Sequence, residues 1–211
     1  MNQKKRKIIR VAGIVLIVAG ICLIAWPFYT NIIMKRQEIE ILSSWDEQVN
    51  SSENSGSEIS ENQDFNSIQG DSLAVDPLKK IPFKITIPSI ESEWIVNEGT
   101  GTDTLKKGPG HYTGTALPGE SGRCVIAGHR TTYGAPFNRA DELKDGDSII
   151  IETAGNEEFI YYVTDIKIVP PTDVSVLKQT ENETLALTTC TPKFYATNRL
   201  IVYAELRDET Q

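Results

Sequence analysis

Regularly spaced patterns of short β-strands limit the fold of this 211-residue chain more than any other feature. From Ile81 onward, seven apolar or alternating segments are separated by turns that contain Gly and Pro. They read FKITI, SEWIV, CVIAGH, DSIIIET, EFIYYVTDIKIV, ETLALTTC and RLIVYAEL. Strands at this spacing are typical of a sandwich or a closed barrel. We therefore predict a mainly β domain over residues 76–211.

The last two strand patterns place a cysteine and an arginine on one face of a sheet. Side chains alternate between the two faces of a strand. The faces expected to point inward hold the apolar residues Leu185, Leu187, Leu200, Val202, Ala204 and Leu206. The opposite faces hold Ala186, Thr188, Cys190, Arg199, Ile201 and Tyr203. We expect Cys190 and Arg199 to lie together on the outer face, at adjacent strand ends, as in a cysteine acyl-transfer site.

A cysteine nucleophile needs a proton-transfer partner, and the chain has two histidines. His129 is the stronger candidate because it ends the strand pattern RCVIAGH, on the face opposite Cys124. His111 lies in GPGHYTG, a run of turn residues that we expect to have no strand to hold it.

These residues and their surroundings resemble the sortases, cysteine transpeptidases of Gram-positive cell surfaces. The similarity extends from about Ile81 to Leu206 and includes KKGPGHYTGTALPGESG, AGHRTTYGAPFNRADEL, IVPPTDVSVL and TCTPKFYATNRLIVYAEL. It is greatest to class E, with class D next. The family signature TLxTC reads ALTTC here, with Ala186 in place of the first threonine. The resemblance implies a closed eight-stranded barrel with short helices, one strand more than the seven patterns.

The resemblance also implies a reaction. Cys190 would cut an LPxTG-like or LAxTG-like motif between Thr and Gly, hold the acyl fragment as a thioester and pass it to an amine of a cell-wall precursor. His129 would act as general acid and base, and Arg199 would stabilise the oxyanion. The substrates would be surface proteins with C-terminal sorting signals, and no cofactor or metal is expected. The candidate substrate-binding residues are Thr188, Thr189, His111 and Tyr112.

The amino-terminal region predicts a membrane anchor. Residues 1–10 carry five positive charges, whereas residues 11–34 carry none and would extend roughly 36 Å as a helix. A cleaved signal peptide is the competing interpretation, but its apolar region would be only about 7 to 15 residues long. The basic flank predicts a cytoplasmic tail, a single span at 11–34 and an extracellular catalytic domain in the cell membrane.

Residues 35–75 should connect the span to the catalytic domain. Residues 34–49 are predicted to form a short helix. Residues 50–75 are rich in Ser, Asn, Glu and Gly, which predicts a flexible linker. The net charge of −8 argues against a nucleic-acid-binding surface.

Three cysteines allow at most one disulfide, and Cys22 falls within the predicted span. A Cys124–Cys190 bridge is the alternative for an exported protein. The alternation opposes it, because Cys124 should face the core while Cys190 faces outward.

Other functions remain open at this point. A pilus-type sortase would join pilin subunits, although no second apolar span follows Leu206. An L,D-transpeptidase also uses a cysteine, but its histidine and arginine lie close around that cysteine, as in SHGCxR. A thioester at Cys190 could instead be opened by water, which would make the protein a thiol protease and hydrolase. A membrane-tethered binding module without catalysis is the non-enzymatic alternative.

Overall fold

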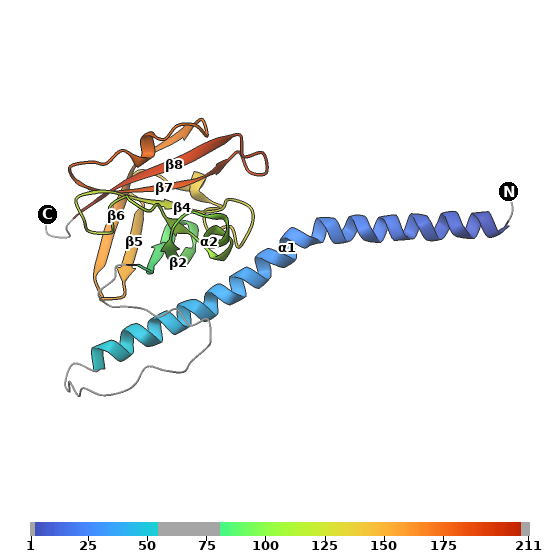
Figure 1. Ribbon diagram of the computed structural model, residues 1–211, viewed down its shortest axis with the longest axis horizontal. Helices are drawn as coiled ribbons and strands as arrows, with labels where there is room; N and C mark the ends of the chain where they lie inside the picture. The colour runs from blue at the N-terminus through green and yellow to red at the C-terminus, as the bar shows by residue number, and fades with distance from the viewer. Residues whose placement is uncertain (1–2, 55–80, 208–211) are drawn as a thin grey trace.

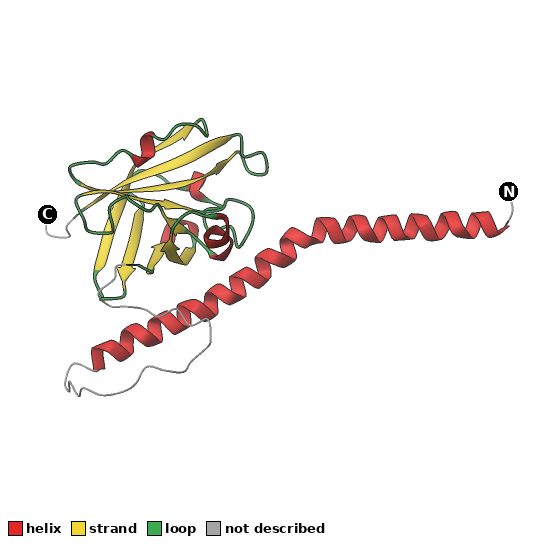
Figure 2. Ribbon diagram, in the orientation of Figure 1, coloured by secondary structure: helices red, strands yellow, loops and turns green. Residues whose placement is uncertain are grey.

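The computed structural model describes residues 3–54 and 81–207, which form one long helix and a closed β-barrel (Figure 1). The helix is α1 (Gln3–Asn54). The strands are β1 (Phe83–Ile87), β2 (Ser92–Glu98), β3 (Gly110–His111), β4 (Gly122–Ala127), β5 (Ser148–Thr153), β6 (Glu158–Val169), β7 (Glu183–Thr191) and β8 (Asn198–Leu206). The short helices are η1 (Pro88–Ile90), α2 (Thr102–Lys107), η2 (Ala140–Glu142) and η3 (Ser175–Leu177). Figure 2 shows that these short helices lie on connections between strands.

The strands follow the order β1-β2-β3-β4-β7-β8-β6-β5, and β5 closes the barrel by pairing with β1. The predicted eight-stranded barrel is therefore confirmed. The strand missed by the sequence patterns is β3, which has only two residues and pairs with both β2 and β4. The prediction that His111 lies in a turn without a strand is wrong. Two residues cannot display a period-2 pattern, so only their partners reveal this strand.

The interior of the barrel follows the predicted alternation of β7 and β8. Leu185, Leu187, Leu200, Val202 and Ala204 are almost fully buried in one core with apolar residues from every long strand. Burying each large aliphatic side chain contributes roughly 1.5–3 kcal/mol. This core fixes the register of the two strands, because a slip by one residue would turn the apolar face to the solvent.

The outer face of the same sheet is covered rather than open. Ala186 and Ile201 are buried there with Val125 of β4 and Val176 of η3. The segment between β6 and β7 therefore packs over the part of the sheet that precedes Cys190. This contact also accounts for the alanine of ALTTC, because position 186 lies in an apolar cluster.

The second half of α1 packs against the outside of β2. Trp45 is 2% exposed and contacts Ile95 and Ala154. Lys84 of β1 forms ion pairs with Asp46 of α1 at 3.2 Å and with Glu152 at 3.0 Å. In Figure 1 this part of α1 lies beside the barrel, while its amino-terminal part extends away from it. The predicted short helix over 34–49 is thus part of a longer helix that docks on the barrel.

Glu38 of α1 takes the place of a missing strand partner. Because β3 pairs only with Asn97 and Glu98, it does not reach Ile95. The carboxylate of Glu38 accepts the Ile95 N–H at 2.7 Å. Burial raises the pKa of Glu38 to about 7, opposed by this hydrogen bond.

Within the described residues, the structure contains no helix that combines the length and the apolar character needed to cross a membrane. Residues 50–54, predicted to be linker, belong to α1. The rest of the predicted linker, 55–75, lies outside the described residues.

Candidate active site

Cys190 and Arg199 are direct partners across the antiparallel β7–β8 pair. Cys190 lies one residue before the end of β7, and Arg199 is the second residue of β8. Directly paired residues project to the same face, so the two side chains share the outer face, as the alternation predicts. Both residues are half-buried and therefore remain accessible.

The guanidinium of Arg199 is held by one carbonyl at the start of β8 and one in the loop before it. Its Nη1 donates to the carbonyl oxygens of Asn198 at 3.2 Å and Ala196 at 3.5 Å. A guanidinium carries five N–H donors, and both bonds use the same nitrogen. The remaining donors can meet an oxygen that carries negative charge next to Cys190.

His129 reaches the same end of the barrel from β4, the parallel neighbour of β7. The ladder pairs Ala127 with Thr188, and the Gly128 N–H continues it by donating to the Thr188 carbonyl at 3.1 Å. His129 and Cys190 each lie two residues beyond the Ala127–Thr188 pair. The backbone register therefore brings the three predicted catalytic residues to the same end of the sheet, and their catalytic roles stay predictions.

Gly128 permits this approach of the histidine segment. A Cβ at this position would lie 2.6 Å from the ring of Phe137, a fully buried core residue. The Phe137 N–H donates to the His129 carbonyl at 3.1 Å, which closes the loop that follows the histidine. Thr189 also holds this segment, because its hydroxyl donates to the Gly128 carbonyl at 2.8 Å.

The imidazole of His129 is half-buried and contacts the ring of Tyr133, with centroids 5.1 Å apart. Burial lowers the pKa of His129 from its ordinary value of 6.5. The ring is therefore mostly neutral at pH 7, which is the form that accepts a proton from a thiol.

The other cysteine of the barrel has a different environment. Cys124 is 1% exposed within the interior core, and burial raises the pKa of its thiol. Both Cys124 and Cys190 are free thiols, so the alternative disulfide does not form. The opposite facing of the two residues, predicted from alternation, accounts for this.

Three of the four predicted substrate-binding residues occupy different environments. Thr188 is half-buried on the outer face with Cys190, whereas Thr189 is buried and binds Gly128. Tyr112 packs against the outer apolar cluster beside β4. Their contacts with a substrate stay predictions.

His111 is buried in the short strand β3. It is 2% exposed, and its Nδ1 lies 3.0 Å from a carboxylate oxygen of Glu98. Its Nε2 lies 3.1 Å from the Ala116 carbonyl and 3.0 Å from the Thr115 hydroxyl. Both ring nitrogens therefore have partners inside the protein, and a role of His111 in substrate binding stays a prediction.

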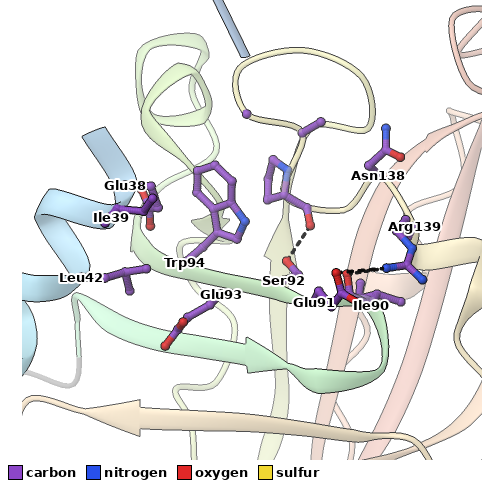
Figure 3. Close-up of a pocket in the computed structure, with 13 residues that line it drawn as sticks. Glu38, Ile39, Leu42, Ile90, Glu91, Ser92, Glu93, Trp94, Asn138 and Arg139 are labelled. Atoms are coloured by element: carbon purple, nitrogen blue, oxygen red, sulfur yellow. Dashed lines mark hydrogen bonds and ion pairs between the residues drawn. The ribbon is translucent and has the colours of Figure 1, made fainter. Parts of the chain in front are cut away.

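A cavity of about 360 Å³ lies between α1, β2 and the loop after His129. Figure 3 shows Glu38, Ile39 and Leu42 on the α1 side, Trp94 of β2 in the middle and Asn138 and Arg139 on the loop side. Its described lining residues include none of the three predicted catalytic residues. The cavity is therefore distinct from the cysteine site, although the same loop borders both.

Comparison with known proteins identifies the family. Residues 85–207, more than half of the chain, match the family model of the sortase domain. The chain belongs to the sortase family. Sortases are cysteine transpeptidases, and similarity to a sortase D and to SrtE sortases supports class D or E for this sortase.

Two curated relatives show the extent of the similarity. Sortase D of Bacillus subtilis is 40% identical over 125 residues, which cover 57% of this chain and 61% of the relative. Sortase SrtE1 of Streptomyces coelicolor is 33% identical over 139 residues, which cover 58% of this chain and 39% of the relative. The match therefore spans less than two thirds of either relative.

The fold is also similar to solved sortases. The structure of sortase E from Streptomyces avermitilis matches with a TM-score of 0.55 and 39% identity, over 60% of this chain and 88% of that one. The similarity supports the eight-stranded sortase barrel that the sequence predicted.

Arg130, which follows His129 directly, lies near the site but was not indicated by any sequence pattern. Its side chain is 2% exposed and contacts the Cys190 carbonyl. The only sequence signal was the adjacency in GHR, and a basic residue in a loop ordinarily points into solvent.

Proposed function

We propose that this sortase is a membrane-anchored transpeptidase that cleaves an LPxTG-like or LAxTG-like motif between Thr and Gly and transfers the acyl group to an amine of a cell-wall precursor. The observation that carries the proposal is the convergence of Cys190, His129 and Arg199 at one end of the β4–β7–β8 sheet. A thiol, an imidazole and a guanidinium supply the nucleophile, the proton carrier and the oxyanion donor that acyl transfer needs.

In the first half of the reaction, Cys190 Sγ attacks the threonine carbonyl while neutral His129 takes the thiol proton. The carbonyl oxygen becomes an oxyanion, which the free donors of Arg199 stabilise. Collapse of this intermediate breaks the C–N bond to glycine. The imidazolium of His129 returns the proton to the leaving amine, and the acyl fragment stays on Cys190 as a thioester.

In the second half, the amine of the wall precursor attacks the thioester. His129 accepts a proton from this amine, Arg199 stabilises the second oxyanion, and the Cys190 thiolate leaves and is reprotonated. The product is a surface protein joined to the wall precursor through a new amide bond.

The anchor follows from the distribution of charge in the sequence. Five positive charges precede an uncharged run of 24 residues at 11–34, which favours a cytoplasmic amino terminus and an extracellular barrel. Held at the membrane surface, the cysteine site would meet lipid-linked wall precursors at a raised effective concentration. Membrane fractionation tests the anchor, and a mature chain that begins after residue 34 would contradict it.

The catalytic proposal is tested with the full chain in detergent micelles. Sorting-motif peptides are incubated with and without a glycine oligomer or a stem-peptide amine, and the products are identified by mass spectrometry. We expect a Cys190 thioester and, with amine present, a transfer product that exceeds hydrolysis. Hydrolysed peptide alone with every amine would identify a thiol protease, and an unmodified Cys190 with every peptide would refute the proposal.

A further inference from the structure

Arg130 is a buried cation that the proposed chemistry does not use. It is 3% exposed, although it lies in the loop after β4. Its Nη2 forms an ion pair with Asp141 of η2 at 2.6 Å, its Nε donates to the Asn138 carbonyl at 2.9 Å, and its Nη1 donates to the Cys190 carbonyl at 3.2 Å. All three nitrogens are therefore engaged, in three directions. Burying a charge in this way is costly unless every donor finds a partner.

The bond to Cys190 stands where the next backbone bond of the β4–β7 ladder would lie. In the β4–β7 ladder the Gly128 N–H donates to the Thr188 carbonyl, so the next bond of the series would run from the N–H of residue 130 to the Cys190 carbonyl. β4 ends at Ala127, and the guanidinium of Arg130 donates to that carbonyl instead. The end of β7 that carries the cysteine is thus held through a side chain.

The other partners of Arg130 hold the loop that carries His129. The carbonyl of Arg130 accepts the side-chain N–H of Asn138 at 2.8 Å, so the two residues bind each other twice. Asn138 also accepts a bond from Lys193, just after Cys190, at 3.3 Å. One cluster therefore joins the histidine loop, η2 and the end of the cysteine strand.

We propose that Arg130 is a positioning residue that fixes the His129 loop against the Cys190 end of β7, so that the imidazole and the thiol stay within proton-transfer distance. The proposal rests on the proposed function of the two residues. Arg130 contacts the Cys190 carbonyl rather than the thiol. Its positive charge is neutralised by the Asp141 carboxylate, which lies 2.6 Å from Nη2. It therefore acts through geometry, and a lysine cannot replace it, because an ammonium lacks the planar fork that reaches three acceptors.

The test compares Arg130→Lys with Arg139→Lys in the full chain. Arg139 lies in the same region and pairs with Glu142 at 2.9 Å, but its side chain is 40% exposed and serves as a matched control. The rates of two reactions at the Cys190 thiol are measured by peptide mapping. The first is acylation by a sorting-motif peptide, and the second is alkylation by iodoacetamide at mildly alkaline pH. Acylation needs His129 in place, whereas alkylation needs only an accessible thiolate.

We expect Arg130→Lys to slow acylation by about 10²-fold, the scale expected for a small misplacement of catalytic groups, and to leave alkylation and KM within about threefold. Arg139→Lys should leave both rates close to those of the unmodified chain. Equal loss of both rates, or unchanged acylation in folded Arg130→Lys, would overturn the positioning role.

Amide hydrogen exchange provides a readout that does not need activity. The Phe137 N–H, which donates to the His129 carbonyl, should exchange at least about tenfold faster in Arg130→Lys than in the unmodified chain. In Arg139→Lys its exchange rate should not change. If exchange rises as expected but the unmodified chain is never acylated, the proposed function fails while the structural role of Arg130 stands. If exchange is unchanged, the inference fails whatever the activity.

Should Arg130→Lys not fold, Asp141→Asn weakens the same cluster more gently, because it keeps an acceptor for the guanidinium and removes only the charge. We expect acylation to fall about tenfold with alkylation nearly unchanged. Faster alkylation of Cys190 in Asp141→Asn, with acylation retained, would show that the charge of Arg130 acts on the thiol and would refute a geometric role.

Discussion

Cys190 and Arg199 face each other as a register pair across β7 and β8, at the end of the barrel that His129 reaches from β4. The pair is held from both sides. The interior core fixes the two strands, and the outer apolar cluster covers the sheet up to the cysteine. Two backbone carbonyls hold the guanidinium of Arg199 beside Cys190, and the proposed function assigns it the role of oxyanion donor.

Replacement of Arg199 by lysine tests that role. The charge is retained, but the fork of donors is lost, so kcat/KM for peptide acylation should fall on the order of 10²-fold or more. Arg207→Lys is the matched control, because Arg207 is exposed and stacks on Tyr162 away from the site. Steady-state kinetics of both variants distinguish the roles, and near-normal kinetics in folded Arg199→Lys would refute the oxyanion assignment.

The two barrel cysteines should respond differently to substitution. Cys190→Ala should abolish thioester formation, as should His129→Ala. Cys124→Ser should retain activity but lose about 1–3 kcal/mol of unfolding free energy, because it places a hydroxyl in the apolar interior. Urea unfolding and mass spectrometry of the thioester check both results. A folded but inactive Cys124→Ser protein would contradict the assignment of the nucleophile.

Gly128→Ala should disturb the approach of the histidine segment to β7. The added Cβ would meet the Phe137 ring at 2.6 Å, so the variant should lose roughly 1–3 kcal/mol of stability and most of its acylation rate. Gly101→Ala is the control, since a Cβ there meets nothing within 4 Å and its φ of −66° suits alanine. Thermal unfolding and single-turnover acylation are the measurements. Equal behaviour of the two variants would show that the close packing at Gly128 is dispensable.

Docking of α1 on the barrel should weaken as the pH rises. Burial raises the pKa of Glu38 from 4.5 to about 7, and nearby Glu93 adds to the shift, so the docked helix binds the proton more tightly than the free helix. Docking is therefore strongest below pH 4.5, weakens between pH 4.5 and about 7, and is constant above that. The free energy of docking should differ by on the order of 3 kcal/mol between pH values below 4.5 and pH values above about 7.

The Ile95 amide proton, which Glu38 accepts, reports this titration by NMR. Its chemical shift should change with a midpoint near pH 7, and Glu38→Gln should remove the change while keeping an acceptor oxygen. Glu40→Gln, at an exposed position of the same helix, is the control and should leave the midpoint in place. A midpoint near 4.5 in the unmodified chain would show that Glu38 is not buried against β2.

The sequence alone determined the local features of this protein. Period-2 alternation identified seven strands and assigned Cys190 and Arg199 to the outer face and Cys124 to the core, because the side-chain direction in a strand depends only on position along it. The family motifs around the cysteine and the histidine led to the sortase barrel and to its eighth strand, which no pattern revealed.

The tertiary structure decided what depends on contacts between distant segments. β3 exists because β2 and β4 flank two residues, and His111 is buried because Glu98, Thr115 and Ala116 surround it. A basic residue in a loop is ordinarily solvated, but Arg130 is buried because Asp141, Asn138 and Cys190 provide three acceptors. Hydrogen-bond partners far along the chain leave no periodic trace in the sequence, so only the folded barrel shows which polar side chains it buries.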